Sequence, residues 1–187
     1  MKHIVCGAAS ALCLVGCNQG PTVSVKNATG NQVAAAVKES GVMTSGSMIE
    51  PGLWQSKVVI QEMTMPGLPP EYADKMKQSI AEHRNDVNKH CVTEADVKKP
   101  KADFFGADKS CKYDHFTMGG GKIDIAMACQ HEGTTNNMKV SGSYTPTTYS
   151  IDTAMTGTGG HENGMSMKMH VDAQRVGQCT GKDDDEG

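Results

Sequence analysis

An alternation of apolar and polar residues from about residue 111 onward constrains the fold of this chain more than any other feature of its sequence. A two-residue period is typical of β-strands that bury one face. The alternation predicts an antiparallel meander whose apolar side chains share one face. The apolar positions of the four runs are Ile123, Ile125, Met127 and Cys129; Met138, Val140 and Tyr144; Tyr149, Ile151, Thr153 and Met155; and Met165, Met167, Met169 and Val171.

The N-terminus reads MKHIVCGAASALCLVGC, a basic start followed by an apolar stretch of signal-peptide length. Its end, Leu14-Val15-Gly16-Cys17, resembles the lipobox of bacterial lipoproteins, in which cleavage precedes a cysteine that carries a diacylglycerol. We therefore expect residues 1–16 to be a signal peptide and Cys17 to be the lipidation site. The protein would then be anchored in a membrane of the cell envelope and face the periplasm, and Asn18 after the cysteine favours the outer membrane. An ordinary secretory signal with an incidental cysteine is the alternative.

Four cysteines follow Cys17, and an even number in an exported protein indicates two disulfides. A hairpin folded on the glycine triplet 119–121 gives one register, which pairs Met118 with Lys122, His115 with Ile125, Tyr113 with Met127 and Cys111 with Cys129. Directly opposed side chains lie about 5 Å apart at Cβ, close enough for a disulfide. We therefore predict Cys111–Cys129, which leaves Cys91–Cys179 as the second pair.

The remaining sequence divides by composition. Residues 17–50 are rich in Gly, Ser, Asn and Thr and are expected to form a flexible tether, with a short helix over 31–40 capped by Thr29. Residues 51–180 are expected to form a single disulfide-stapled domain. The acidic run 181–187 is expected to be a disordered tail.

Inside this domain, residues 57–65 predict a strand, and residues 70–90 predict one long helix that begins at Pro70. Tyr72, Met76, Ile80 and Val87 form a narrow apolar stripe on this helix. The expected fold is α+β, a curved antiparallel sheet of about six strands in a meander with one main helix packed on its apolar face. So narrow a stripe covers little of such a sheet, which leaves open whether the methionine-rich face is a closed core or a groove.

Several segments of residues 50–179 resemble a known family. They are Pro-Gly-Leu-Trp at 51–54, Met-Thr-Met-Pro-Gly-Leu-Pro at 63–69, His-Cys-Val-Thr at 90–93, the Cys…Gly-Gly-Lys…Met-Ala-Cys hairpin at 111–129 and Arg-Val-Gly-Gln-Cys at 175–179. In this order they are similar to the proteobacterial domain of unknown function 3617. The resemblance implies an exported or lipid-anchored, β-rich protein, and it carries over no catalytic residue.

Charge and motifs argue against several function classes. A net charge of −3 with two arginines does not provide the dense basic face that nucleic acids require. The sequence contains no nucleophile elbow, P-loop or dinucleotide fingerprint, so we expect no enzyme and no cofactor. His131-Glu132 and His161-Glu162 each lack the second histidine of a zinc-protease helix, and we predict no metal site there.

Methionine is abundant, with 13 residues against three Phe and one Trp. Methionine fills apolar cores, and we expect most of these side chains to do so, with Trp54 as a core anchor. The sequence thus predicts a non-catalytic envelope protein with a binding or structural role, whose partner is a hydrophobic small molecule or an envelope protein. The alternative is a periplasmic Cu(I)-binding protein, because Met165, Met167 and Met169 share a strand face and His170 lies beside them in sequence.

Overall fold

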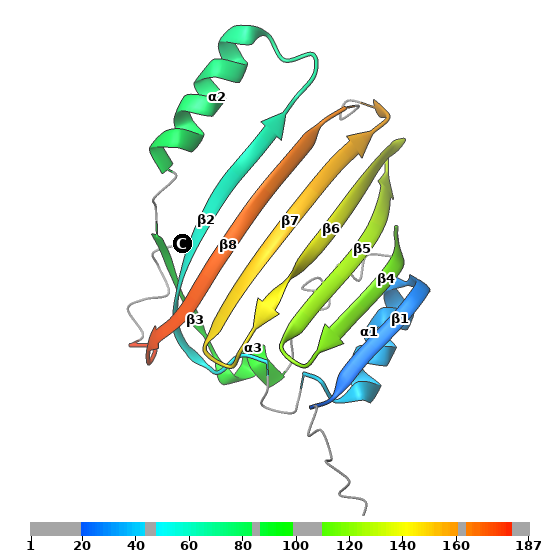
Figure 1. Ribbon diagram of the computed structural model, residues 1–187, viewed down its shortest axis with the longest axis vertical. Coiled ribbons are helices and arrows are strands. Elements are labelled where there is room, and N and C mark those ends of the chain that lie inside the picture. The colour runs from blue at the N-terminus through cyan, green and yellow to red at the C-terminus, as the bar shows by residue number, and fades with distance from the viewer. Residues whose placement is uncertain (1–19, 44–47, 84–86, 99–109, 161–163, 181–187) are drawn as a thin grey trace, which may run out of the picture.

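The computed structural model describes residues 20–43, 48–83, 87–98, 110–160 and 164–180. Eight strands in this part of the chain form one open antiparallel sheet in the order β1-β4-β5-β6-β7-β8-β2-β3 (Figure 1). The strands are β1 (Thr22–Thr29), β2 (Gly52–Thr64), β3 (Val87–Val92), β4 (Cys111–Gly119), β5 (Lys122–His131), β6 (Thr134–Tyr144), β7 (Thr148–Thr158) and β8 (Ser166–Gly177). The helices are α1 (Gly30–Ser40), α2 (Pro70–Glu82) and α3 (Glu94–Lys98).

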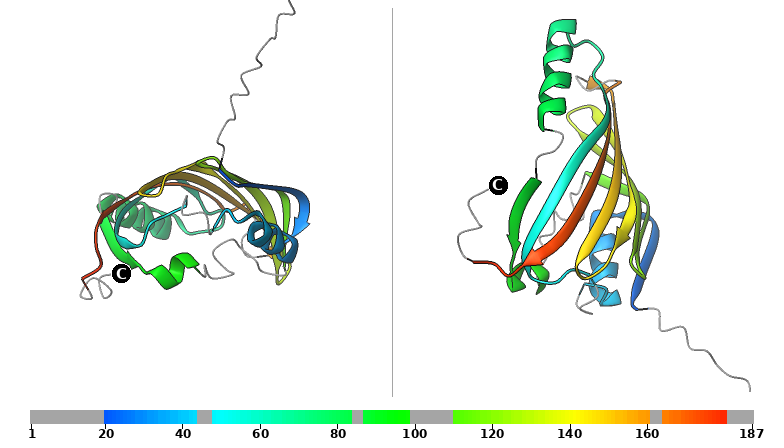
Figure 2. Two further views of the ribbon diagram at one scale, coloured as in Figure 1. Left: turned by 90° about the horizontal axis from the view of Figure 1, so that it is seen from below. Right: turned by 60° about the vertical axis from the view of Figure 1, so that its left-hand side comes forward.

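The sheet is strongly curved, and α1 and α3 lie on its concave side (Figure 2). Strands β4 to β8 form the meander that the alternation predicts. The register places apolar residues of neighbouring strands directly opposite one another, for example Met118 opposite Ile123 and Ile151 opposite Val171. Because side chains alternate along a strand, this register collects the apolar positions of the meander on the concave face.

The main difference from the expected organisation concerns residues 22–40, which composition assigns to a flexible tether. They form β1 and α1, so the sheet has an additional strand beside β4. Val23 alternates with polar neighbours and is buried, as are Val33 and Val37 of α1. Thr29 is the N-cap of α1, as expected, and its hydroxyl accepts a hydrogen bond from the backbone N–H of Gln32.

The prediction of one long helix over residues 70–90 is wrong for the second half of this segment. Helix α2 ends at Glu82, and residues 87–92 form β3, which pairs with the first half of β2. Of the α2 side chains that the structure describes, Ala73, Met76 and Ile80 are half-buried, while Tyr72 is 55% exposed. Helix α2 lies at the end of β2 rather than on the middle of the apolar face, which α1 covers in part instead (Figure 1).

The structure contains both disulfides, Cys111–Cys129 and Cys91–Cys179. The register between β4 and β5 agrees with the expected one at Cys111 and Tyr113 but is shifted by one residue nearer the turn, where Gly119 faces Lys122. The turn therefore contains two residues, Gly120 and Gly121, which both have positive φ as a type I′ turn requires. A bulge at Asp114 takes up the extra residue, so His115 faces Ala126 instead of Ile125.

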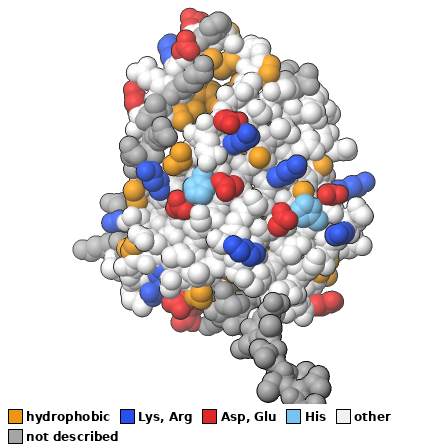
Figure 3. Space-filling model, in the orientation of Figure 1, with side chains coloured by type: hydrophobic (Ala, Val, Ile, Leu, Met, Phe, Trp, Pro, Cys, Tyr) orange, Lys and Arg blue, Asp and Glu red, His pale blue; other side chains and the backbone are white. Residues whose placement is uncertain are grey.

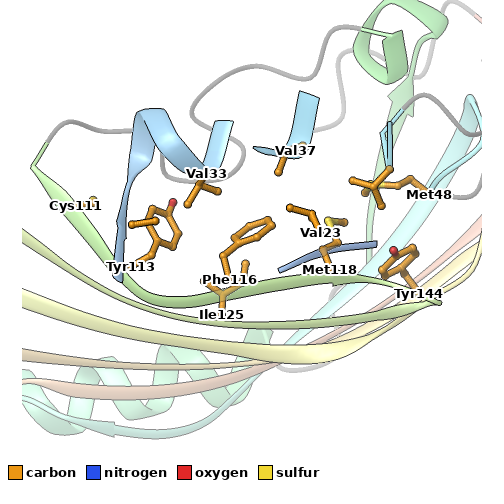
Figure 4. Close-up of a cluster of buried hydrophobic side chains, with 12 residues drawn as sticks. Val23, Val33, Val37, Met48, Cys111, Tyr113, Phe116, Met118, Ile125 and Tyr144 are labelled. Atoms are coloured by element: carbon orange, nitrogen blue, oxygen red, sulfur yellow. The ribbon is translucent and has the colours of Figure 1, made fainter. Parts of the chain in front are cut away.

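The larger of two buried clusters lies between α1 and the β1-β4-β5 end of the sheet (Figure 4). Phe116 is fully buried, and its ring meets that of Tyr113 edge to face at 6.0 Å between centroids. The smaller cluster surrounds Trp54 at the other side of the sheet, with Val92 and Ala173. Further apolar side chains lie on the concave face between the two clusters and belong to neither.

Candidate functional site

The concave face holds a cavity of about 630 Å³ between the two buried clusters. Its lining is largely apolar and comes from the five strands of the meander, from β2 and β3, from α3 and from the segments between α1 and β2. The lining residues are Met43, Met48, Ile49, Trp54, His90, Cys91, Val92, Asp96, Val97, Met118, Ile123, Tyr144, Tyr149, Ile151 and Val171. We call this space the concave cavity.

Gly142 accounts for part of the curvature around the concave cavity. It lies between Ile123 and Ile151 in the cross-strand register. A Cβ at this position would approach the backbone of Ser150 and would lie 2.9 Å from the Cα of Ile151. Strands β6 and β7 can bend this closely only because residue 142 has no side chain.

Trp54 forms one wall of the concave cavity, and the structure confirms that it is a core anchor with no exposed surface. Its indole stacks on Tyr149 with 5.7 Å between ring centroids. The indole N–H donates a hydrogen bond to the backbone oxygen of Glu50 at 2.9 Å. The wall is thus fixed by both packing and a hydrogen bond, which favours a preformed cavity.

The polar residues of the lining include two tyrosines and Asp96. Burial raises the pKa of Tyr144 and of Tyr149, so both phenols stay neutral near pH 7. The Asp96 carboxylate accepts hydrogen bonds from the backbone N–H and the hydroxyl of Thr93, at 2.9 Å and 2.6 Å, and so caps α3. The chemistry of this lining therefore suits an apolar ligand better than a charged one.

A row of five methionines crosses the sheet farther along the strands. Successive members face one another in register across β5, β6, β7, β8 and β2. We call this the methionine row, and it consists of Met127, Met138, Met155, Met167 and Met63. All five side chains are half-buried, so the row lies within the apolar face rather than on the solvent face.

His170 lies on the opposite, convex face, because it faces Asp152 while its neighbour Met169 faces Thr153. His170 therefore does not share a face with the methionines that lie beside it in sequence. Its Nδ1 lies 2.7 Å from Asp152 Oδ1 and its Nε2 lies 3.1 Å from Asp172 Oδ2. Figure 3 shows the charged side chains and two histidines of this face.

Ser150 completes an arrangement that resembles a catalytic triad, with its hydroxyl oxygen 3.4 Å from His170 Nε2. Hydrogen bonding to Asp152 raises the pKa of His170, and Asp172 adds to this effect. A histidine held between two carboxylates favours its protonated form, which cannot accept a serine proton. His115 forms a similar cluster with Asp114 and Asp124, with each ring nitrogen 3.2 Å from one carboxylate.

The two His-Glu pairs of the sequence were not expected to bind a metal. His131, the last residue of β5, and Glu132, in the turn that follows, are both exposed, with 3.9 Å between Nε2 and Oε1. Cys17 and the pair His161-Glu162 lie outside the described residues. No group of three or more metal-ligating His, Cys, Asp or Glu side chains occurs in the described ranges.

Comparison with known proteins identifies the family. The family model described as "Protein of unknown function (DUF3617)" matches residues 49–179, which include seven of the eight strands. The chain belongs to this family. Within the family domain lie both disulfides and most of the concave cavity, whereas β1 and α1 precede it.

No curated protein and no solved structure matches the chain significantly. The disulfides suggest an extracytoplasmic location, because thiols remain reduced in the cytoplasm. None of the helices in the described part of the chain is long and apolar enough to cross a membrane.

Proposed function

We propose that this protein is a non-catalytic binding module of the cell envelope that holds an apolar ligand, such as an acyl chain, in the concave cavity. The observation that carries the proposal is a half-open, largely apolar space of about 630 Å³ on the concave face. This volume falls within the range of small-molecule sites, and a lining of apolar side chains with few polar groups is typical of them. Each methylene transferred from water into such a space contributes about 0.8 kcal/mol.

The proposed location is the periplasmic side of the outer membrane, with Cys17 as the acylated residue. The lipobox-like sequence before Cys17 and the two disulfides support this placement. Membrane fractionation of cells that express Cys17→Ala tests it. The variant should leave the membrane fraction, and unchanged sedimentation with membranes would contradict lipid anchoring.

Ligand binding can be tested with a fluorescent fatty acid as the probe. Trp54 is the single tryptophan of the chain and lines the concave cavity, so its emission should change as the probe saturates the site. The double substitution Ile151→Phe/Val171→Phe fills part of the cavity and should weaken binding by about tenfold or more. Val176→Phe is the matched control, because Val176 also belongs to β8 but is exposed.

Native mass spectrometry of protein extracted from membranes provides an independent readout. A bound mass of lipid size, lost in the double variant and kept in Val176→Phe, would support the proposal. An unliganded mass together with no saturable probe binding would refute it and would favour a purely structural domain.

A further inference from the structure

Another cavity, smaller and half open, lies between α2 and the end of β2. Its volume is about 260 Å³, and three methionines contribute to its lining, Met63, Met65 and Met76. The remaining lining residues are Thr64, Leu68, Ala73 and Ile80. We call this space the thioether cavity. Hydrophobic side chains gather beside α2 on the surface as well (Figure 3).

The elements around the thioether cavity direct its three methionines toward a common space. Met63 lies near the end of β2 and Met65 directly follows the strand, and both residues line the cavity. Met76 belongs to the half-buried face of α2, which also presents Ala73 and Ile80 to the cavity. A methionine side chain has three rotatable bonds, so its sulfur can shift by several ångströms without backbone movement.

A fourth thioether lies next to this group. Met63 is also the last member of the methionine row, and Met167 faces it directly on β8. Directly opposed side chains in an antiparallel pair lie about 5 Å apart at Cβ. The concave curvature of the sheet brings the tips of such side chains closer together than their Cα atoms.

This set of donors has a specific chemical preference. Thioethers are soft, neutral ligands that select Cu(I) over the harder divalent ions, which prefer imidazole or carboxylate. The cavity lining consists of apolar side chains, thioethers and the Thr64 hydroxyl. Such surroundings penalise a monovalent ion with polarisable ligands less than a divalent ion.

We propose that the thioether cavity is a Cu(I) site, with Met63, Met65 and Met76 as ligands and Met167 adjacent. The site is separate from the concave cavity and does not depend on ligand binding there. Because two ligands come from the β2 end and one from α2, the bound ion would also fix α2 to the sheet.

The test is an anaerobic titration of the full-length protein with Cu(I) against a competing chromogenic chelator. Free thiols are first blocked with N-ethylmaleimide while the disulfides stay intact, because the cysteines of the N-terminal segment would otherwise bind Cu(I). The variant Met63→Leu/Met65→Leu/Met76→Leu keeps apolar volume but removes the sulfurs. Met43→Leu/Met48→Leu/Met118→Leu is the matched control, since these three methionines line the concave cavity instead.

The proposal predicts a wild-type Kd below about 1 µM, at least about tenfold weaker binding in the first variant, and an unchanged Kd in the control. Hydrogen exchange of α2 backbone amides should slow when Cu(I) binds to the wild type. The single variant Met76→Leu should also weaken Cu(I) binding. It replaces the triple variant in the test if circular dichroism shows that the triple variant is unfolded. A wild-type Kd weaker than about 1 µM, or equal affinities in both triple variants, would overturn the proposal.

Discussion

Replacing Cys91 and Cys179 by alanine removes the covalent link between edge strand β3 and the chain that follows β8. The two cysteines are 88 residues apart in sequence, so the disulfide closes a long loop in the unfolded chain. The chain-entropy relation for a loop of this length gives about 4.6 kcal/mol at 25 °C. Both side chains are only half-buried, so their truncation adds little loss of packing. We expect the free energy of unfolding to fall by about 4–5 kcal/mol.

Urea denaturation without reductant, followed by Trp54 fluorescence and far-ultraviolet circular dichroism, measures this loss. The urea dependence of the unfolding free energy, the m value, should increase, because the unlinked chain exposes more surface when it unfolds. The matched control is Cys111→Ala/Cys129→Ala, whose disulfide spans 18 residues. Its loop term is about 3.2 kcal/mol, and Cys111 adds a packing loss because it is buried.

The m values therefore separate the two variants better than the free energies do. Lost packing destabilises the folded state and leaves the m value almost unchanged, whereas loss of the disulfide loop expands the unfolded chain and so raises the m value. The rise in m should be larger without Cys91–Cys179 than without Cys111–Cys129. A loss below about 1 kcal/mol with unchanged m, or the reverse order of m values, would refute the reasoning.

Three further predictions concern the sheet and its two faces. Gly142→Ala should lower the unfolding free energy by about 1–3 kcal/mol. The control Gly177→Ala, at a position in β8 with open space around it, should change the unfolding free energy little. Equal urea midpoints for the two variants would contradict the close approach at Gly142. Trp54→Ala should cost about 3–5 kcal/mol by urea denaturation, and a loss under about 1 kcal/mol would show that the smaller cluster contributes little. The raised pKa of His170 stabilises the fold at pH below 6.5, its ordinary value, and this contribution disappears as pH rises through the folded pKa. The lowered pKa of Asp172 acts in the opposite direction, with a contribution that is lost as pH falls below 3.8. The melting temperature of His170→Gln should therefore lie farther below that of the wild type at about pH 5.5 than at about pH 8.5, and an equal gap would argue against the ion-pair cluster.

The meander was predictable because its strands depend on a local pattern. Alternation alone places Ile151 and Val171 on one face, and it holds in the structure. The pairing of Cys111 with Cys129 followed from the same pattern, although the observed hairpin departs from the expected register in two ways that compensate each other. The glycine turn is one residue shorter than expected, and the bulge at Asp114 restores the register. A bulge leaves little trace in a single sequence, since any polar residue can occupy it.

The elements at the two edges of the sheet were harder to predict. Residues 87–92 contain one short polar run between Val87 and Val92, and their pairing with β2 is a long-range contact that local periodicity does not encode. Strand β1 lies in a segment whose composition is typical of linkers, and its partner β4 is more than 80 residues away. The concave cavity depends on the curvature at Gly142 and on side chains from many elements, so it could not be inferred from spacing.

If Cys17 is acylated as we propose, the position of β1 decides which end of the domain lies near the membrane. Thr22 begins β1 and faces Gly119, at the same end of the sheet as the turns beside the concave cavity. With Cys17 acylated, the five residues from there to Thr22 span at most about 18 Å. The end of the sheet with the turns beside the concave cavity would then lie within this distance of the bilayer, and the end that carries the thioether cavity would lie farther from it. A lipid would have a short path from the membrane to the concave cavity, whereas a metal ion would reach the thioether cavity on the side away from the membrane.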